Sequence, residues 1–162
     1  MSWANPESEM DSPVVGSGYA STDLLLPAEI ASQIACLSEI TYPFDTCGLL
    51  IGRPIESTIL VEQFTYGRNL ESTSFQEPGI PRRFRLDPDD VETARHVAQN
   101  ADLDIVGIWR SHPDTPARPN RSDLDSAWAN TSYLIASVCA LGCTELRSWR
   151  LSDDQFLEER LR

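Results

Sequence analysis

The sequence has no lysine, so all 13 of its basic side chains other than histidine are arginines. A codon usage biased towards arginine explains this most simply, and the functional interpretation is that no side chain can accept an isopeptide bond. Acidic residues number 25, which gives a formal net charge of −12. Binding to a phosphate backbone needs clustered cations that release counterions, so this composition argues against a nucleic-acid partner.

Long apolar runs and paired cysteines are also missing. No apolar stretch approaches the roughly 18 residues of a membrane-spanning helix, and the N-terminus lacks the basic-then-apolar order of a signal peptide. We therefore expect a cytoplasmic protein that does not bind membranes. The four cysteines show no C-x-x-C spacing, which argues against a disulfide framework and against a four-thiolate zinc site, and favours buried free thiols.

The length of 162 residues and the hydrophobic content of 41% predict a single domain with one core. Residues 1–22 are rich in Ser, Gly, Pro and acidic residues without periodicity, so we expect a flexible N-terminal arm followed by one domain at 23–162. Apolar residues recur at helical spacing between Pro27 and Pro43, which predicts an amphipathic helix there.

Further periodic segments predict the rest of the fold. Residues 104–109 form a fully apolar stretch, which predicts a central strand that delivers residues 110–112 at its exposed end. We also expect a hairpin at 47–52 and 58–64, a long loop at 69–83, strands at 84–86, 133–138 and 145–151, a helix from Asp87 to near Asn100, and a short helix capped by Asn120 or Ser122 that runs to Trp128. This order favours the α+β class (mixed α/β), with a central mixed sheet flanked by two or three helices.

The most informative segment is residues 107–123, with the sequence Gly-Ile-Trp-Arg-Ser-His-Pro-Asp-Thr-Pro-Ala-Arg-Pro-Asn-Arg-Ser-Asp. It resembles the signature of the JAMM (MPN-type) zinc metalloprotease family, in which a strand end supplies His-x-His, a proline-bearing loop follows, and Ser-x-x-Asp opens the next helix. Residues 42–52, in which a carboxylate precedes Cys-Gly by two positions, also resemble a family segment. The resemblance covers residues 24–162 and implies an MPN/JAMM-like fold with a cytidine-deaminase-like layout.

The resemblance implies a zinc site of two histidines and one aspartate, with a glutamate as general base and a serine that assists the oxyanion. At these positions the sequence has Arg110 and His112 for the histidines, Asp123 for the aspartate, Asp45 for the glutamate and Asn120 for the serine. His112 and Asp123 are therefore the candidate metal ligands, and Asp45 and Asn120 the candidate catalytic residues. Arg110 cannot replace the third ligand, because a guanidinium stays protonated and has no lone pair to donate, so zinc is not expected to bind as in the family.

Two neighbours and one distant residue complete the set of candidates. Trp109 and Ser111 flank Arg110, and we expect them to contact the substrate. The only other histidine, His96, falls on a predicted helix away from the motif, so we expect it at the surface rather than as a substitute ligand.

The resemblance implies hydrolysis after the C-terminal glycines of ubiquitin-like or sulfur-carrier proteins. With Arg110 in place of a ligand, we expect a catalytically impaired homologue that still recognises such tails; the alternative is an active zinc isopeptidase or peptidase that processes them. Family members without a complete metal site pair with active relatives, so we also expect a homodimer or a heterodimer with another MPN domain. Finally, without a metal the site carboxylates need another cation, so Arg110 is predicted to lie at the metal position and to pair with Asp123 through two hydrogen bonds.

Overall fold

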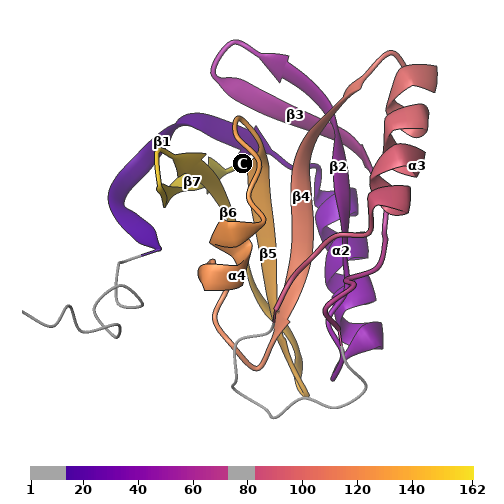
Figure 1. Ribbon diagram of the computed structural model, residues 1–162, viewed down its shortest axis with the longest axis vertical. Helices are drawn as coiled ribbons and strands as arrows, with labels where there is room; N and C mark the ends of the chain where they lie inside the picture. The colour runs from indigo at the N-terminus through magenta and orange to yellow at the C-terminus, as the bar shows by residue number, and fades with distance from the viewer. Residues whose placement is uncertain (1–13, 73–82) are drawn as a thin grey trace, which may run out of the picture.

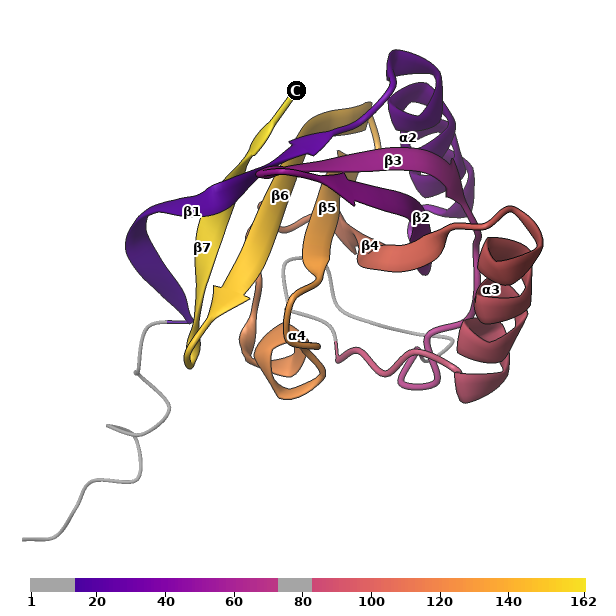
Figure 2. The ribbon, with the colours of Figure 1, turned by 90° about the horizontal axis from the view of Figure 1, so that it is seen from above.

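The computed structural model describes residues 14–72 and 83–162, so the predictions for residues 1–13 and for most of the long loop lie outside the described residues. Seven strands form a closed barrel in the order β1-β3-β2-β4-β5-β6-β7 (Figures 1 and 2). Their bounds are β1 Val15–Leu25, β2 Cys47–Ile55, β3 Thr58–Phe64, β4 Asp104–Pro113, β5 Ser132–Cys139, β6 Gly142–Ser152 and β7 Gln155–Leu161. The described residues also form three helices, α2 (Ala28–Thr41), α3 (Pro88–Asn100) and α4 (Arg121–Asp125).

The predicted fold class, a central mixed sheet flanked by two or three helices, is wrong, because the seven strands close into a barrel. Closure depends on β1 and β7, which the sequence analysis did not predict and which pair in parallel with each other. β1 also pairs in parallel with β3, and β7 pairs with β6 in antiparallel fashion. Residues 15–22, which were assigned to a flexible arm, therefore form most of β1, and backbone pairing supplies the order that their Ser- and Gly-rich sequence did not indicate.

The hairpin of β2 and β3 and the two longer helices are confirmed. Pro27 stands at the N-cap of α2, and the Asp87 side chain accepts a hydrogen bond of 3.0 Å from the Asp89 backbone N–H at the start of α3. Two predictions are corrected: residues 84–86 make only an isolated bridge between Asn69 and Leu86 instead of a strand, and α4 ends at Asp125 rather than near Trp128.

Two groups of buried apolar residues cover the two faces of the central strands. Ile30 and Ile34 of α2 pack on one face together with Trp109 of β4, whereas Ile108 packs on the other face with residues of α3. Side chains alternate along a strand, so Arg110 follows Ile108 towards the face that α3 and α4 cover (Figure 2). Its position in the barrel therefore places Arg110 inside the protein.

Two further expectations from composition can be compared with the structure. All four cysteines lie in the described part of the chain and are free; Cys47 is fully buried as expected, but Cys36 is exposed on α2. Among the described helices, none is long and apolar enough to cross a membrane.

Candidate functional site

Arg110 and His112 lie in the last four residues of β4 and are buried there, rather than standing at an exposed strand end. β4 runs to Pro113, longer than predicted, and pairs with β2 up to Arg110 and with β5 along residues 107–113. As alternate residues of one strand, the two side chains project from the same face. Only 1% of Arg110 and 3% of His112 is exposed, so both are core residues of the site.

Asp123 reaches the same place from α4. The Asn120 side chain accepts a hydrogen bond of 3.0 Å from the Asp123 backbone N–H, and Asp123 Oδ2 accepts one of 2.7 Å from the Asn120 backbone N–H. This reciprocal capping fixes both side chains at the start of α4. The preceding loop is anchored by the Trp149 indole, which donates 3.0 Å to the Ala117 carbonyl oxygen. The fully buried Asp123 carboxylate is thereby turned towards β4.

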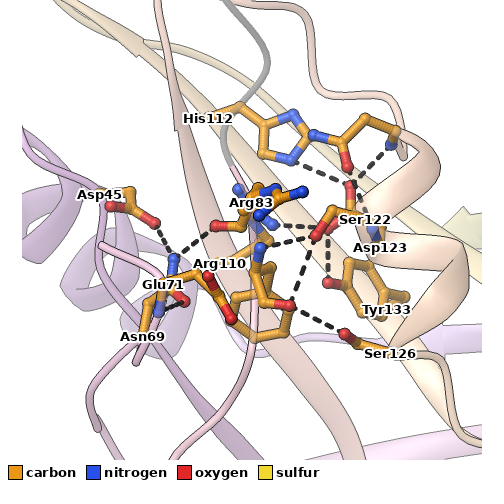
Figure 3. A network of polar contacts seen from close by, with 12 residues as sticks. Asp45, Asn69, Glu71, Arg83, Arg110, His112, Ser122, Asp123, Ser126 and Tyr133 are labelled. Carbon is orange, nitrogen blue, oxygen red and sulfur yellow. Dashed lines mark hydrogen bonds and ion pairs between the residues drawn. The ribbon is translucent and has the colours of Figure 1, made fainter. Parts of the chain in front are cut away.

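Arg110 pairs with Asp123, as predicted (Figure 3). Arg110 Nη1 donates to Asp123 Oδ1 at 2.7 Å, and the Tyr133 hydroxyl donates to the same oxygen at 2.7 Å. The guanidinium carbon also lies 4.7 Å from the centroid of the Phe84 ring, within range of a cation–π contact. The prediction of two hydrogen bonds between Arg110 and Asp123 is wrong: one forms, to Oδ1, and Asp123 Oδ2 accepts from the Asn120 N–H.

Electrostatics within this pair favour the two charged forms. Burial, the largest single influence, would raise the pKa of the Asp123 carboxyl, but the Arg110 charge together with His112 and the Asn120 backbone N–H brings the pKa down to about 2. Burial would lower the pKa of Arg110, but Asp123 together with Tyr133 and Asp45 raises it. Burial followed by the Asp123 charge raises the pKa of Tyr133 well above its usual value, so its hydroxyl stays a donor. Arg110 and Asp123 therefore form a buried ion pair at neutral pH.

His112 lies at the edge of this pair. Its Nδ1 is 3.0 Å from the Pro116 carbonyl oxygen, which can only accept, so Nδ1 carries a proton. Nε2 is buried and lies 3.3 Å from Asp123 Oδ2, at ion-pair distance but without hydrogen-bond geometry. The ring is thus oriented by a backbone carbonyl and directs Nε2 towards the carboxylate, which is the orientation that a metal ligand would need.

On the other side of Arg110, Asp45 accepts hydrogen bonds from a side-chain amide and a hydroxyl (Figure 3). Asn69 Nδ2 donates to its Oδ2 at 2.7 Å, and Ser72 Oγ donates to its Oδ1 at 3.0 Å. Asp45 is 7% exposed. Burial first and the Asp45 charge second raise the pKa of the Cys47 thiol to about 12, and the Asp45 charge also raises the pKa of Arg110. Asp45 therefore faces the same centre as Asp123.

The structure places Trp109 and Ser111 differently from the residues that they flank. Trp109 is fully buried on the α2 face, and its indole donates 2.8 Å to the Thr65 carbonyl oxygen. Ser111 is also fully buried, and its Oγ accepts a hydrogen bond of 2.9 Å from the Thr46 backbone N–H. Neither side chain presents exposed surface to a substrate in this conformation. His96 is at the surface, as expected, 3.4 Å from Glu92.

Three residues of the site were missed. Tyr133 was predicted only as part of an apolar strand, and Phe84 as part of a strand that does not form. Asn69 was placed in a loop without periodicity, and no local pattern indicates that its amide is buried. The need of the buried Asp123 carboxylate for hydrogen-bond donors could have suggested Tyr133. The roles of Asn69 and Phe84 depend on contacts with residues that are distant in the sequence.

The donor set does not fit the zinc site of the family. His112 and Asp123 supply two ligands, but the third position holds a guanidinium that offers only N–H donors and is already bonded to Asp123. In residues 14–72 and 83–162 no cluster of three His, Cys, Asp or Glu side chains is placed to hold a metal ion. Hydrolysis through a three-ligand zinc ion therefore has no support in this arrangement of residues.

Comparison with known proteins gives the site a context. A family model described as prokaryotic homologs of the JAB domain matches residues 27–152. The chain is 27% identical over 137 residues to the CysO-cysteine peptidase of Mycobacterium tuberculosis, covering 84% of this chain and 88% of that protein. It is 29% identical over 117 residues to a desampylase of Pyrococcus furiosus, covering 71% of this chain and 72% of that protein.

Solved structures show the same likeness. The solution structure of a protein from Desulfitobacterium hafniense matches with a TM-score of 0.70 at 27% identity, covering 86% of this chain and 91% of that chain. The solution structure of a protein from Salinibacter ruber matches with a TM-score of 0.64 at 30% identity, covering 86% and 90%.

Proposed function

This chain belongs to the family of prokaryotic homologs of the JAB domain, and we propose that it recognises the C-terminal tails of ubiquitin-like or sulfur-carrier proteins without cutting them efficiently. The tail-recognition part rests on the relatives, which are named a CysO-cysteine peptidase and desampylases. The impaired-cleavage part rests on one observation, the 2.7 Å bond between Arg110 Nη1 and Asp123 Oδ1.

The bond matters because of what each partner would otherwise do. A hydrolytic zinc site needs three protein ligands and an open position for water. Arg110 removes one ligand, engages a second, and adds a fixed positive charge that repels a divalent cation. Asp45 retains a carboxylate at the position of the general base, and Asn120 retains an amide at the position of the oxyanion donor, so the site keeps polar groups that a tail could contact.

The alternative function is an active zinc isopeptidase or peptidase for the same tails, and the orientation of His112 favours it. With Nδ1 directed to the Pro116 carbonyl, Nε2 and Asp123 Oδ2 stand 3.3 Å apart, a spacing that two ligands of one metal ion could adopt. For this function Arg110 would have to leave Asp123. Asp45 would then be the base, and His112 and Asp123 the ligands.

Binding and cleavage can be measured separately to test these functions. The protein, purified without chelator, is mixed with a labelled peptide that ends in Gly-Gly and with a fusion that extends beyond the two glycines. We expect binding of the Gly-Gly peptide with no cleavage of the fusion, with or without added zinc. Cleavage that depends on zinc would establish the alternative, and absence of binding to any such tail would remove the proposed function.

Pairing with another MPN domain and a cytoplasmic location remain predictions. Sedimentation equilibrium of the purified chain, alone and mixed with an active family member, would detect a dimer. Fractionation of the source cells would give the location.

A further inference from the structure

Asn69 is a buried polar residue with every hydrogen-bonding group of its amide engaged. Nδ2 donates to Asp45 Oδ2 at 2.7 Å and to the Arg83 carbonyl oxygen at 2.8 Å. Oδ1 accepts from the Glu71 N–H at 3.0 Å and from the Arg85 N–H at 2.9 Å. An asparagine amide has two donor hydrogens and two acceptor lone pairs, and here all four have partners.

Three of these four bonds involve the backbone of described residues that lie before position 73 or after position 82 in the sequence. Glu71 lies before position 73, whereas Arg83 and Arg85 lie after position 82. A backbone bond of 2.8 Å from the Leu70 N–H to the Arg85 carbonyl oxygen joins the same two parts of the chain. The Asn69 side chain thus connects the backbone at Glu71 with the backbone at Arg83 and Arg85.

The fourth bond, from Asn69 to Asp45, connects these backbone segments to the candidate site. Asp45 Oδ2 receives the Asn69 amide, and Asp45 Oδ1 receives the Ser72 hydroxyl at 3.0 Å from the same stretch of chain. Phe84, next to Arg83, contacts the part of the site around Asp123. Its backbone bonds to Ser122 and Ser126 of the α4 region, and its ring lies against Arg110. Figure 3 shows the polar contacts of Asp45 and Asn69 beside those of Arg110 and Asp123.

We propose that Asn69 is a positioning residue of this site: its amide sets the orientation of the Asp45 carboxylate and couples it to the backbone of residues 71, 83 and 85. The inference rests on the proposed tail-recognition function for its effect on binding, but its structural part does not. Common replacements at position 69 would not supply the same four bonds. Aspartate lacks the donor for Asp45, glutamine is longer by one methylene, and an apolar residue would leave the Asp45 and backbone groups without these partners.

An isosteric pair of substitutions tests the proposal. Asn69→Asp keeps the acceptor for the Glu71 and Arg85 N–H groups but sets two carboxylates against each other across 2.7 Å. Asp45→Asn in the same chain restores one amide and one carboxylate with their places exchanged. Asn130→Asp is the matched control, because Asn130 is exposed and its φ of 59° is tolerated by Asp.

Two readouts are recorded for the wild type, the two single variants, the double variant and the control. The first is affinity for a labelled peptide that ends in Gly-Gly, and we expect Asn69→Asp to weaken it by about tenfold or more, since a buried charge-assisted bond is replaced by repulsion. The double variant should recover most of the lost affinity, and the control variant should bind the peptide as tightly as the wild type. The second is the side-chain amide resonance pair of Asn69, which should move strongly in the Asp45→Asn variant and stay in place in the control.

The outcomes separate the two levels of inference. If the wild type binds no Gly-Gly peptide, the proposed function fails and the Asn69 amide resonances alone decide the positioning role. If Asn69→Asp binds like the wild type, or if the double variant is no better than the single one while both remain folded by circular dichroism, Asn69 does not position Asp45. Amide resonances of Asn69 that are unchanged by Asp45→Asn would overturn the proposal on their own.

Discussion

The two carboxylates of the site are held in contrasting ways. Asp123 is fully buried and compensated by a charge, the Arg110 guanidinium at 2.7 Å. Asp45 is slightly more exposed and receives hydrogen bonds from the neutral amide of Asn69 and the hydroxyl of Ser72. The contrast teaches that the arginine substitution acts most directly at the ligand position, where Arg110 bonds to Asp123, whereas Asn69 and Ser72 hold the carboxylate at the base position through hydrogen bonds.

The strongest way to break this contrast is Arg110→Met, which removes the charge and keeps much of the side-chain volume. We expect a loss of about 3–5 kcal/mol in the free energy of unfolding at pH 7, because Asp123 is left as an uncompensated buried charge. Arg53→Met is the matched control, since the Arg53–Glu62 pair is exposed and screened by solvent, so its loss should change the free energy of unfolding far less. Urea unfolding of the two variants measures both values, and a loss below about 1 kcal/mol for Arg110→Met would contradict the buried-pair account.

Acid should erase part of the difference between the wild type and Arg110→Met. The folded pKa of Asp123 is about 2, below its ordinary value of 3.8, so its stabilising effect is complete above pH 3.8 and is lost as the pH falls through about 2. This depression corresponds to about 2 kcal/mol. Urea unfolding at pH 7, 4 and 2.5 should therefore show the gap narrowing between pH 4 and 2.5. A gap that is constant across this range would mean that the Arg110 charge does not stabilise the ionised Asp123.

Removing a hydrogen-bond donor of Asp45 should destabilise the fold much less than removing the Arg110 charge. Ser72→Ala removes the hydroxyl of an exposed residue that donates to the buried Asp45 carboxylate, and should cost about 0.5–1.5 kcal/mol. Ser152→Ala, at an exposed position at the end of β6, is the control and should change the unfolding free energy by less than about 0.5 kcal/mol. If Ser72→Ala proved as destabilising as Arg110→Met, the ion pair at Asp123 would contribute no more to stability than one hydrogen bond at Asp45.

The sequence predicted the Asp123 side of this contrast better than the Asp45 side. The motif spacing placed Arg110, His112 and Asp123 in one site, because a central strand and the capped start of a helix are both encoded locally. The role of Asn69 could not be predicted, since its partners are separated by up to 24 positions and come together only when the chain folds.

Barrel closure escaped prediction for a related reason. β1 has a polar, Ser- and Gly-containing sequence without clear alternation, and its pairing with β7 joins residues at opposite ends of the chain, such as Val15 and Phe156. Such long-range pairing depends on tertiary context rather than on local propensity. In contrast, α3 was predicted with its N-cap because Asp87 and Pro88 are local signals.

The central claim is that Arg110 stands where a zinc ligand is needed and prevents a complete metal site. Its most direct test is a calorimetric zinc titration of the wild type beside the Arg110→His, Asp45→Glu double variant, which restores the third ligand and the longer carboxylate. The account predicts no stoichiometric binding by the wild type and binding of one zinc ion by the double variant. One zinc ion bound tightly by the wild type, or none bound by a folded double variant, would contradict it.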